Sequence, residues 1–181
     1  MKKFFAMMMA LAMLFSFAAC GSKPAEPTTA PTEAAAKVEG TMEELLNKVV
    51  EINPVEFMGG TMPIDLTDTS EDGLWNIKYN TGLDSAEGLT DAAMFGPMMG
   101  SMAFSMVMVR TAEGTDVKAI AEGMKNGIDP RKWICVEADD LQVVSYGDVV
   151  MLIMVDSTSG LTSQSFVDAF AQVCGGSVTT Y

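Results

Sequence analysis

An acidic segment in the first half of the chain has the spacing of a calcium-binding loop. Asp68, Ser70 and Asp72 place side-chain oxygen atoms at the first, third and fifth positions, and Gly73 follows at the sixth. The twelfth position, where such loops use a bidentate glutamate, is Tyr79. The same residues suit the N-cap and acidic first turn of a short helix. We favour the helix cap and keep a Ca²⁺ site at Asp68, Ser70 and Asp72 as the alternative.

A cluster of six methionines follows, and thioethers are soft ligands that suit Cu(I). Strand alternation would place Met106 and Met108 on one face, which favours packing in the core. Methionine also lines adaptable binding surfaces. We therefore expect a hydrophobic groove, with Cu(I) binding as the alternative. The cluster comprises Met94, Met98, Met99, Met102, Met106 and Met108, and the expected ligand-binding residues are Trp75, Tyr79, Met98, Met99 and Met102.

Two cysteines lie in the second half of the chain, Cys135 and Cys174. Outside the cytosol they could form a disulfide, and otherwise they are two buried free thiols. The sequence leaves both alternatives open. Neither is expected to be a catalytic nucleophile, because the chain contains no histidine that could activate a thiol.

Three acidic residues near a tryptophan form the remaining candidate for catalysis. Glu137, Asp139 and Asp140 follow Trp133, and paired carboxylates beside an aromatic ring are typical of glycosidases. A cluster of acids in a loop is more commonly a solvated surface. We therefore predict that the protein is not an enzyme and needs no cofactor. A hydrolase that uses acids alone is the least favoured function.

The N-terminus has the pattern of a lipoprotein signal peptide over residues 1–19. Lys2 and Lys3 precede an apolar run that is shorter than the roughly 20 residues needed to span a bilayer. The run ends in Phe17-Ala18-Ala19-Cys20, which resembles the lipobox of bacterial lipoproteins, although Phe17 replaces the usual leucine. The resemblance implies that Cys20 carries a diacylglyceryl anchor. Two acyl chains bind a membrane stably, so we expect a location on the outer face of the cytoplasmic membrane.

The remaining sequence divides into a linker and one domain. Residues 20–40 are rich in Pro, Ala and Thr and lack aromatic residues, so they are expected to be a disordered tether. Residues 41–181 can form a single exported domain. The chain has 11 basic and 24 acidic residues, a net charge of −13, and loss of Lys2 and Lys3 with the leader makes it −15. This charge repels phosphate backbones and excludes a nucleic-acid partner.

Hydrophobic periodicity indicates an α+β domain. The expected sheet is antiparallel, with about four strands and with helices on one face. A weak repeat at an offset of 46 residues aligns two strand-strand-helix units, and two N-terminal helices would pack at the edge or end of the sheet. The expected helices cover 42–53, 70–79, 116–127 and 162–174, and the expected strands cover 89–99 as a weak edge strand, 103–111, 141–145 and 149–156.

Between Leu45 and Phe170 the chain resembles small clostridial (Firmicutes) surface lipoproteins that share a domain of unknown function. The matching features are the Tyr79–Asp84 segment, the strand at Met106–Thr111 with its helix, and the hairpin at Val143–Val155. The resemblance implies an α+β fold outside the membrane and supplies no catalytic residues. We therefore expect a non-enzymatic, lipid-anchored module that binds a small ligand or an envelope protein, with metal binding as the alternative.

Overall fold

The computed structural model describes residues 37–181. The predicted signal peptide at residues 1–19, the predicted lipid attachment at Cys20 and the predicted tether up to residue 36 therefore lie outside the described residues. Within residues 37–181, no helix combines the length and the apolar character needed to cross a membrane.

The core of the domain is an antiparallel sheet of six strands in the order β1-β2-β3-β5-β4-β6. The prediction of about four strands is wrong, because two short strands were missed. The first contains two glycines and a proline, and the second has only two residues, so neither shows alternation. Their pairing also makes the expected edge strand an internal one. The strands are β1 (Gly59–Pro63), β2 (Leu89–Pro97), β3 (Phe104–Thr111), β4 (Asp140–Tyr146), β5 (Val149–Val155) and β6 (Thr179–Thr180).

Four α-helices form at the positions that the sequence predicts. Each begins after a side chain that accepts a hydrogen bond from a backbone N–H of the first turn, which satisfies a donor that the helix itself cannot pair. Thr41 forms a full capping box with Glu44, and Gly82 ends the second helix in a left-handed conformation. The helices are α1 (Met42–Ile52), α2 (Glu71–Thr81), α3 (Val117–Gly127) and α4 (Ser163–Cys174), with a short 3₁₀ turn at Ser157–Ser159.

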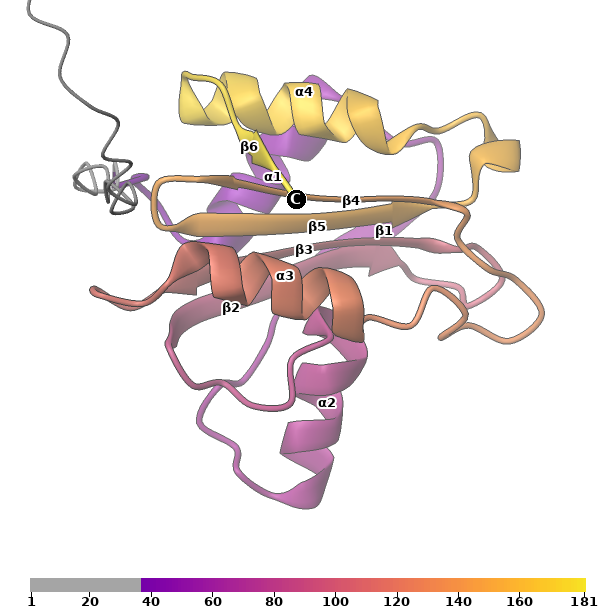
Figure 1. The fold of residues 1–181 in the computed structure, drawn as a ribbon. Coiled ribbons are helices and arrows are strands. Elements are labelled where there is room, and N and C mark those ends of the chain that lie inside the picture. Colours follow the sequence, from indigo (N-terminus) through magenta and orange to yellow (C-terminus); the bar gives the residue numbers. More distant parts are fainter. Residues whose placement is uncertain (1–36) are drawn as a thin grey trace, which may run out of the picture. The chain divides into compact units, whose positions relative to one another are not determined.

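Helices cover both faces of the sheet, so the prediction that they share one face is wrong. Figure 1 shows α1 and α4 on one side, and α2 and α3 on the other. The cause is the apolar character of the two central strands on both sides. In β3, Met106 packs with α1 and α4, whereas Val107 packs with α2 and α3. A strand that is apolar on both sides needs cover on both sides.

The two strand-strand-helix units of the predicted repeat are present as β2-β3-α3 and β4-β5-α4. They are not equivalent in space. Met106 faces the core beneath α1 and α4, whereas Leu152, 46 residues later, faces the opposite core. The shared pattern therefore reflects the common requirements of a strand-turn-helix segment and places the two helices on opposite faces.

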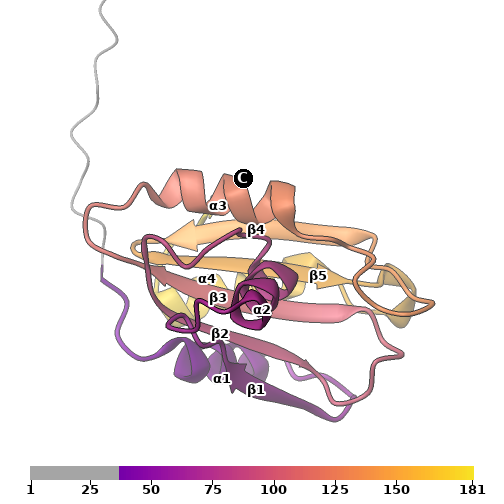
Figure 2. The ribbon, with the colours of Figure 1, turned by 90° about the horizontal axis from the view of Figure 1, so that it is seen from below.

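Helix α2 projects away from the sheet instead of lying along it. Figure 2 looks nearly along its axis, with α3 lying flat across β4 beside it. Its C-terminal end is held closely against the C-terminal end of α3. A Cβ atom added at Gly127 would lie 2.0 Å from the carbonyl oxygen of Gly82. This close approach between two backbones fixes the position from which α2 extends.

The chain enters the domain along the end of the sheet where β4 turns into β5. Val38 is buried in the core under α1, and its N–H donates to Asp148 at 3.2 Å. Arg110 donates to the same carboxylate at 2.6 Å and to the carbonyl of Gly40 at 2.7 Å. Residues 38–40, which the sequence assigned to the tether, are thus fastened to the sheet by one ion pair that is mostly shielded from solvent.

We expect Arg110→Met to lower the free energy of unfolding by about 2 kcal/mol, because hydrogen bonds to charged groups contribute about 1.5–3 kcal/mol and Asp148 loses its counter-ion. Urea denaturation would measure the loss, and faster amide exchange at Val38 would locate it. Lys118→Met is the matched control, since Lys118 pairs with Glu122 on the exposed surface of α3 and such a pair contributes under about 0.5 kcal/mol. Equal losses in the two variants would contradict the prediction.

Candidate functional site

A cavity of about 320 Å³ lies between α2 and the segment that follows α3. The residues from α2 stand three and four positions apart, so they share one face of the helix. The opposite wall is the end of α3 and the start of the loop 128–139. The volume is within the range of small-molecule sites. The lining residues are Trp75, Lys78, Tyr79, Gly127, Asp129, Arg131 and Lys132, and we call this cavity the aromatic–cationic pocket.

Two stacked aromatic rings form the α2 wall of the pocket. The rings of Trp75 and Tyr79 lie 4.8 Å apart with an angle of 23° between their planes. Trp75 remains 63% exposed, so much of its ring surface is open to contact by a ligand. The hydroxyl of Tyr79 donates to the carbonyl of Lys132 at 3.3 Å and so connects the helix to the loop.

Lys132 is the central charged group of the pocket. Its Nζ donates to the carbonyl of Tyr79 at 3.2 Å and to the hydroxyl of Ser105, on β3, at 3.1 Å. It also lies 4.8 Å from the centre of the Tyr79 ring and 5.4 Å from that of Trp133. Among residues 37–181, no carboxylate lies within ion-pair distance of this amine.

Burial lowers the pKa of Lys132 to about 8, and the carboxylate of Asp129 acts weakly in the opposite direction. Removal of an ammonium group from water disfavours its charged form, and a nearby anion or hydrogen-bond acceptors offset that cost. Lys132 therefore remains mostly protonated at neutral pH, but without a direct counter-ion. Such groups in a cavity are candidates for functional residues.

The two other basic side chains of the pocket have acidic partners of their own. Lys78 pairs with Asp84 at 2.5 Å, and the Nε of Arg131 pairs with Glu137 at 2.5 Å. All four of these side chains are largely exposed. They form a charged rim that is nearly neutral in total, and Lys132 is left as the cation whose charge is not balanced by contact.

The loop that carries Arg131 and Lys132 is irregular but attached to the fold. The N–H of Ala138 donates to the carbonyl of Pro130 at 2.9 Å, and Asp139 donates to Val155 at the end of β5. Cys135 has a φ of 67°, a left-handed conformation that is uncommon for residues other than glycine. The neighbouring Ile134 is 85% exposed. Strained backbone and exposed apolar side chains are more common at functional loops than elsewhere.

The predicted groove is only partly formed. Trp75 and Tyr79 do lie together, but no methionine lines their pocket. Met98 and Met99 lie in the connection between β2 and β3, with 73% and 71% of each residue exposed. Met102 packs against the core under α1 and α4, on the other face of the sheet from α2. The structure therefore pairs the aromatic residues with cations instead of thioethers.

The other methionines of the cluster are divided between the two faces of the sheet. Met106 and Met108 share the face under α1 and α4, as strand alternation predicts. Met94 packs against the opposite core, with α2 and α3. Sulfur atoms on both sides of a sheet cannot converge on one ion, so the six methionines do not act as one set of ligands, and binding of Cu(I) stays a prediction.

The acidic segment before α2 forms the helix cap that we favoured. Asp68 accepts from the N–H of Ser70 at 2.9 Å, and the hydroxyl of Ser70 accepts from the N–H of Gly73 at 3.1 Å. The hydrogen bonds from Ser70 lower the pKa of Asp68. In residues 37–181, no group of three or more acidic or cysteine side chains is arranged to hold a metal ion. Binding of Ca²⁺ by Asp68, Ser70 and Asp72 stays a prediction.

Cys135 and Cys174 are free thiols in the described part of the chain. Cys135 precedes β4, whereas Cys174 ends α4, where the Asp148 carboxylate and, more strongly, burial raise the pKa of its thiol to about 11. The two ends of a seven-residue strand are about 20 Å apart, far beyond the reach of a disulfide. The two cysteines are not paired in this structure, and Cys135 is exposed instead of buried.

The acids of the glycosidase-like cluster are engaged in structural contacts. Glu137 pairs with Arg131, and Asp139 accepts from both the N–H and the hydroxyl of Ser157, which lowers its pKa. Asp140 accepts in the same way from Ser163, at the first turn of α4. Each carboxylate thus holds a loop or a helix end, and they do not face one another across a cavity.

Sequence reasoning missed every lining residue of the pocket except Trp75 and Tyr79, and the most important of those missed is Lys132. The only signal was the basic pair before Trp133, within an acidic chain. Comparisons with protein-family models, with curated proteins and with solved structures found no match for this chain. The resemblance to clostridial lipoproteins therefore stays a prediction, and the argument for function depends on the geometry of the pocket.

Proposed function

We propose that the protein is a lipid-anchored module on the outer face of the cytoplasmic membrane, which binds a small ligand in the aromatic–cationic pocket without chemical conversion. The observation that carries the proposal is Lys132, a largely buried amine that donates only to neutral acceptors and lies beside the stacked rings of Trp75 and Tyr79. Aromatic side chains next to a few placed charged groups are common in small-molecule sites, and this pocket has both.

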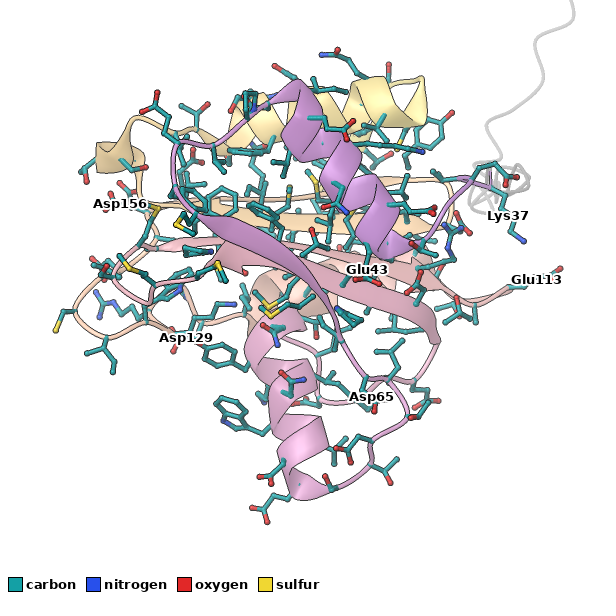
Figure 3. The ribbon with its side chains drawn as sticks, turned by 180° about the vertical axis from the view of Figure 1, so that it is seen from behind. Lys37, Glu43, Asp65, Glu113, Asp129 and Asp156 are labelled. Atoms are coloured by element: carbon teal, nitrogen blue, oxygen red, sulfur yellow. The ribbon has the colours of Figure 1, made fainter. Side chains whose placement is uncertain are left out.

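The position of the pocket fits a module that is anchored through Cys20. Figure 3 shows Lys37, where the described chain begins, and Asp129, which lines the pocket, at opposite ends of the sheet. Hydrogen bonds to the two ends of β5 agree with this view. Val38 contacts Asp148, just before β5 begins, whereas Asp139, at the end of the loop 128–139, contacts Val155, where β5 ends. The chain therefore enters the domain at the end of the sheet that lies away from the pocket.

Native mass spectrometry of the full-length protein, purified in mild detergent from its own envelope, tests ligand binding. We expect a small molecule to remain bound and to be lost from the Trp75→Ala variant. Ile134→Ala, an equally exposed apolar truncation outside the lining, should retain it. The absence of any bound molecule, together with no thermal shift across a metabolite library, would refute the proposal.

The anchor is tested separately by a Cys20→Ser substitution. We expect the wild-type chain to take up labelled fatty acid and to sediment with membranes, since two acyl chains give stable binding. The variant should lose the label completely and remain uncleaved by the lipoprotein signal peptidase. Equal labelling of both chains would show that Cys20 is not the modified residue.

A further inference from the structure

We propose that the ligand of the aromatic–cationic pocket is a small monocarboxylate with an apolar body, whose carboxylate binds Nζ of Lys132 while the apolar part lies against Trp75 and Tyr79. This inference rests on the proposed binding function and names the chemical class of the ligand.

The amine of Lys132 has one N–H donor without a hydrogen-bond acceptor among the described residues. An ammonium group has three N–H donors, and Nζ of Lys132 uses two of them, toward the Tyr79 carbonyl and the Ser105 hydroxyl. Both acceptors are neutral. Among the described residues, no third hydrogen bond from this nitrogen is formed. A carboxylate oxygen supplies the missing acceptor and the missing negative charge in one group.

In the protein without a ligand, burial of the Lys132 ammonium group costs free energy. Burial makes the charged form of Lys132 less favourable, as its pKa of about 8 shows. A bound anion reverses that effect, because an opposite charge stabilises the ammonium group. The groups around the amine are Tyr79 from α2, Ser105 from β3, and Asp129 and Trp133 from the loop. Of these only Asp129 is an anion, and its side chain accepts from the N–H of Arg131 at 2.8 Å.

The charges around the pocket favour a ligand with one negative charge over a ligand with several. Lys78 and Arg131 are already neutralised by Asp84 and Glu137. Of the 11 basic and 24 acidic residues, three and two precede residue 37, which leaves the described domain with a net charge of −14. A field of this sign repels anions in proportion to their charge. Lys132, with Asp129 as the one carboxylate of the lining and beyond ion-pair distance, therefore suits a ligand with one negative charge better than a phosphate group with two.

Two aromatic side chains form an apolar wall of the pocket. Trp75 and Tyr79 line the same cavity as Lys132, and the exposed surface of Trp75 has no partner within the described chain. An apolar body that covers these rings removes them from water, at about 25 cal/mol per Å² of apolar surface. The pocket therefore places an aromatic surface beside the amine of Lys132, as a monocarboxylate with an apolar body requires.

The test uses 3-phenylpropionate and its amide, which have the same shape and differ in charge. Affinities are measured by NMR titration of the full-length lipoprotein in detergent micelles. We expect the carboxylate to bind at least tenfold more tightly than the amide. In Lys132→Met the affinity for the carboxylate should fall at least tenfold, while that for the amide stays within twofold and shows that the pocket is still folded. Lys118→Met, on the exposed surface of α3, should change neither.

The pH dependence gives a second readout. Binding requires protonated Lys132 and an ionised ligand, so the affinity for the carboxylate should be nearly constant between about pH 6 and 7, above the usual pKa of a carboxyl group and below the pKa of Lys132 of about 8. Above that pH it should fall by nearly tenfold per pH unit, until the raised pKa of the complex is reached. The affinity for the amide should not change over the same range.

The outcomes distinguish the two proposals. Equal affinities for the carboxylate and the amide, or tighter binding of inorganic phosphate, would overturn the monocarboxylate inference and leave the binding function intact. A neutral or cationic molecule found in the native mass spectrum would overturn it as well, and a carboxylate found there would support it. If no small molecule binds at all, the proposed function itself fails.

Discussion

Phe104→Ala is expected to lower the free energy of unfolding by about 3–5 kcal/mol, the usual cost of a cavity left by a buried aromatic ring. Phe104 begins β3 and is only 1% exposed. Its ring packs against three others, with centroid distances of 5.1 Å to Phe57, 6.0 Å to Phe95 and 5.2 Å to Phe166. Loss of this side chain therefore removes contacts to β2, α4 and the segment before β1 together.

Guanidinium denaturation, followed by far-UV circular dichroism, would measure the change. Ile134→Ala is the control, because that side chain is exposed and its truncation should stay within about 0.5 kcal/mol of wild type. If Phe104→Ala is as mild as this control, the aromatic cluster does not hold α4 to the sheet as described.

Gly127→Ala should have the second largest effect, a loss of about 3 kcal/mol, together with loss of ligand binding. The new Cβ would lie 2.0 Å from the carbonyl oxygen of Gly82 and 3.0 Å from its carbonyl carbon. Backbone atoms cannot rotate away as a flexible side chain does, so α2 and α3 must separate. Because Gly127 itself lines the pocket, this separation would displace Tyr79 from Lys132.

Thermal denaturation measures the first effect, and titration with 3-phenylpropionate measures the second. Gly100→Ala is the matched control, because a Cβ at that position in the β2–β3 connection would meet open space. If both substitutions change stability equally, the close approach of α2 and α3 is not a constraint on the fold.

The sequence predicted the helices well because their signals are local. Thr41, Ser70, Asp116 and Thr162 cap the helices as expected, since an oxygen side chain at a helix start needs no tertiary information. The short strand β1 could not be found, because its pairing depends on β2, 30 residues later. The wrong prediction that all helices lie on one face could have been avoided, because the sequence of β3 is apolar at positions that face both sides of the sheet.

The sequence predicted only the part of the pocket that lies within helix α2. Trp75 and Tyr79 are four residues apart on α2, so helical geometry alone brings them together. Lys132 lies more than 50 residues away, and its burial results from the docking of α2 against the loop. A lysine that will be enclosed looks like any solvated lysine in a sequence, and this is why the central group of the site was missed.

The order of the central strands also has a kinetic consequence. β4 and β5 are joined by a two-residue turn at Gly147 and Asp148, and β2 and β3 are likewise neighbours along the chain. Such hairpins form within about 1–10 μs. The pairing of β3 with β5, however, joins residues such as Val107 and Leu152 across a long loop. We therefore expect the closure of this loop, with its entropic cost, to limit the rate at which the domain folds.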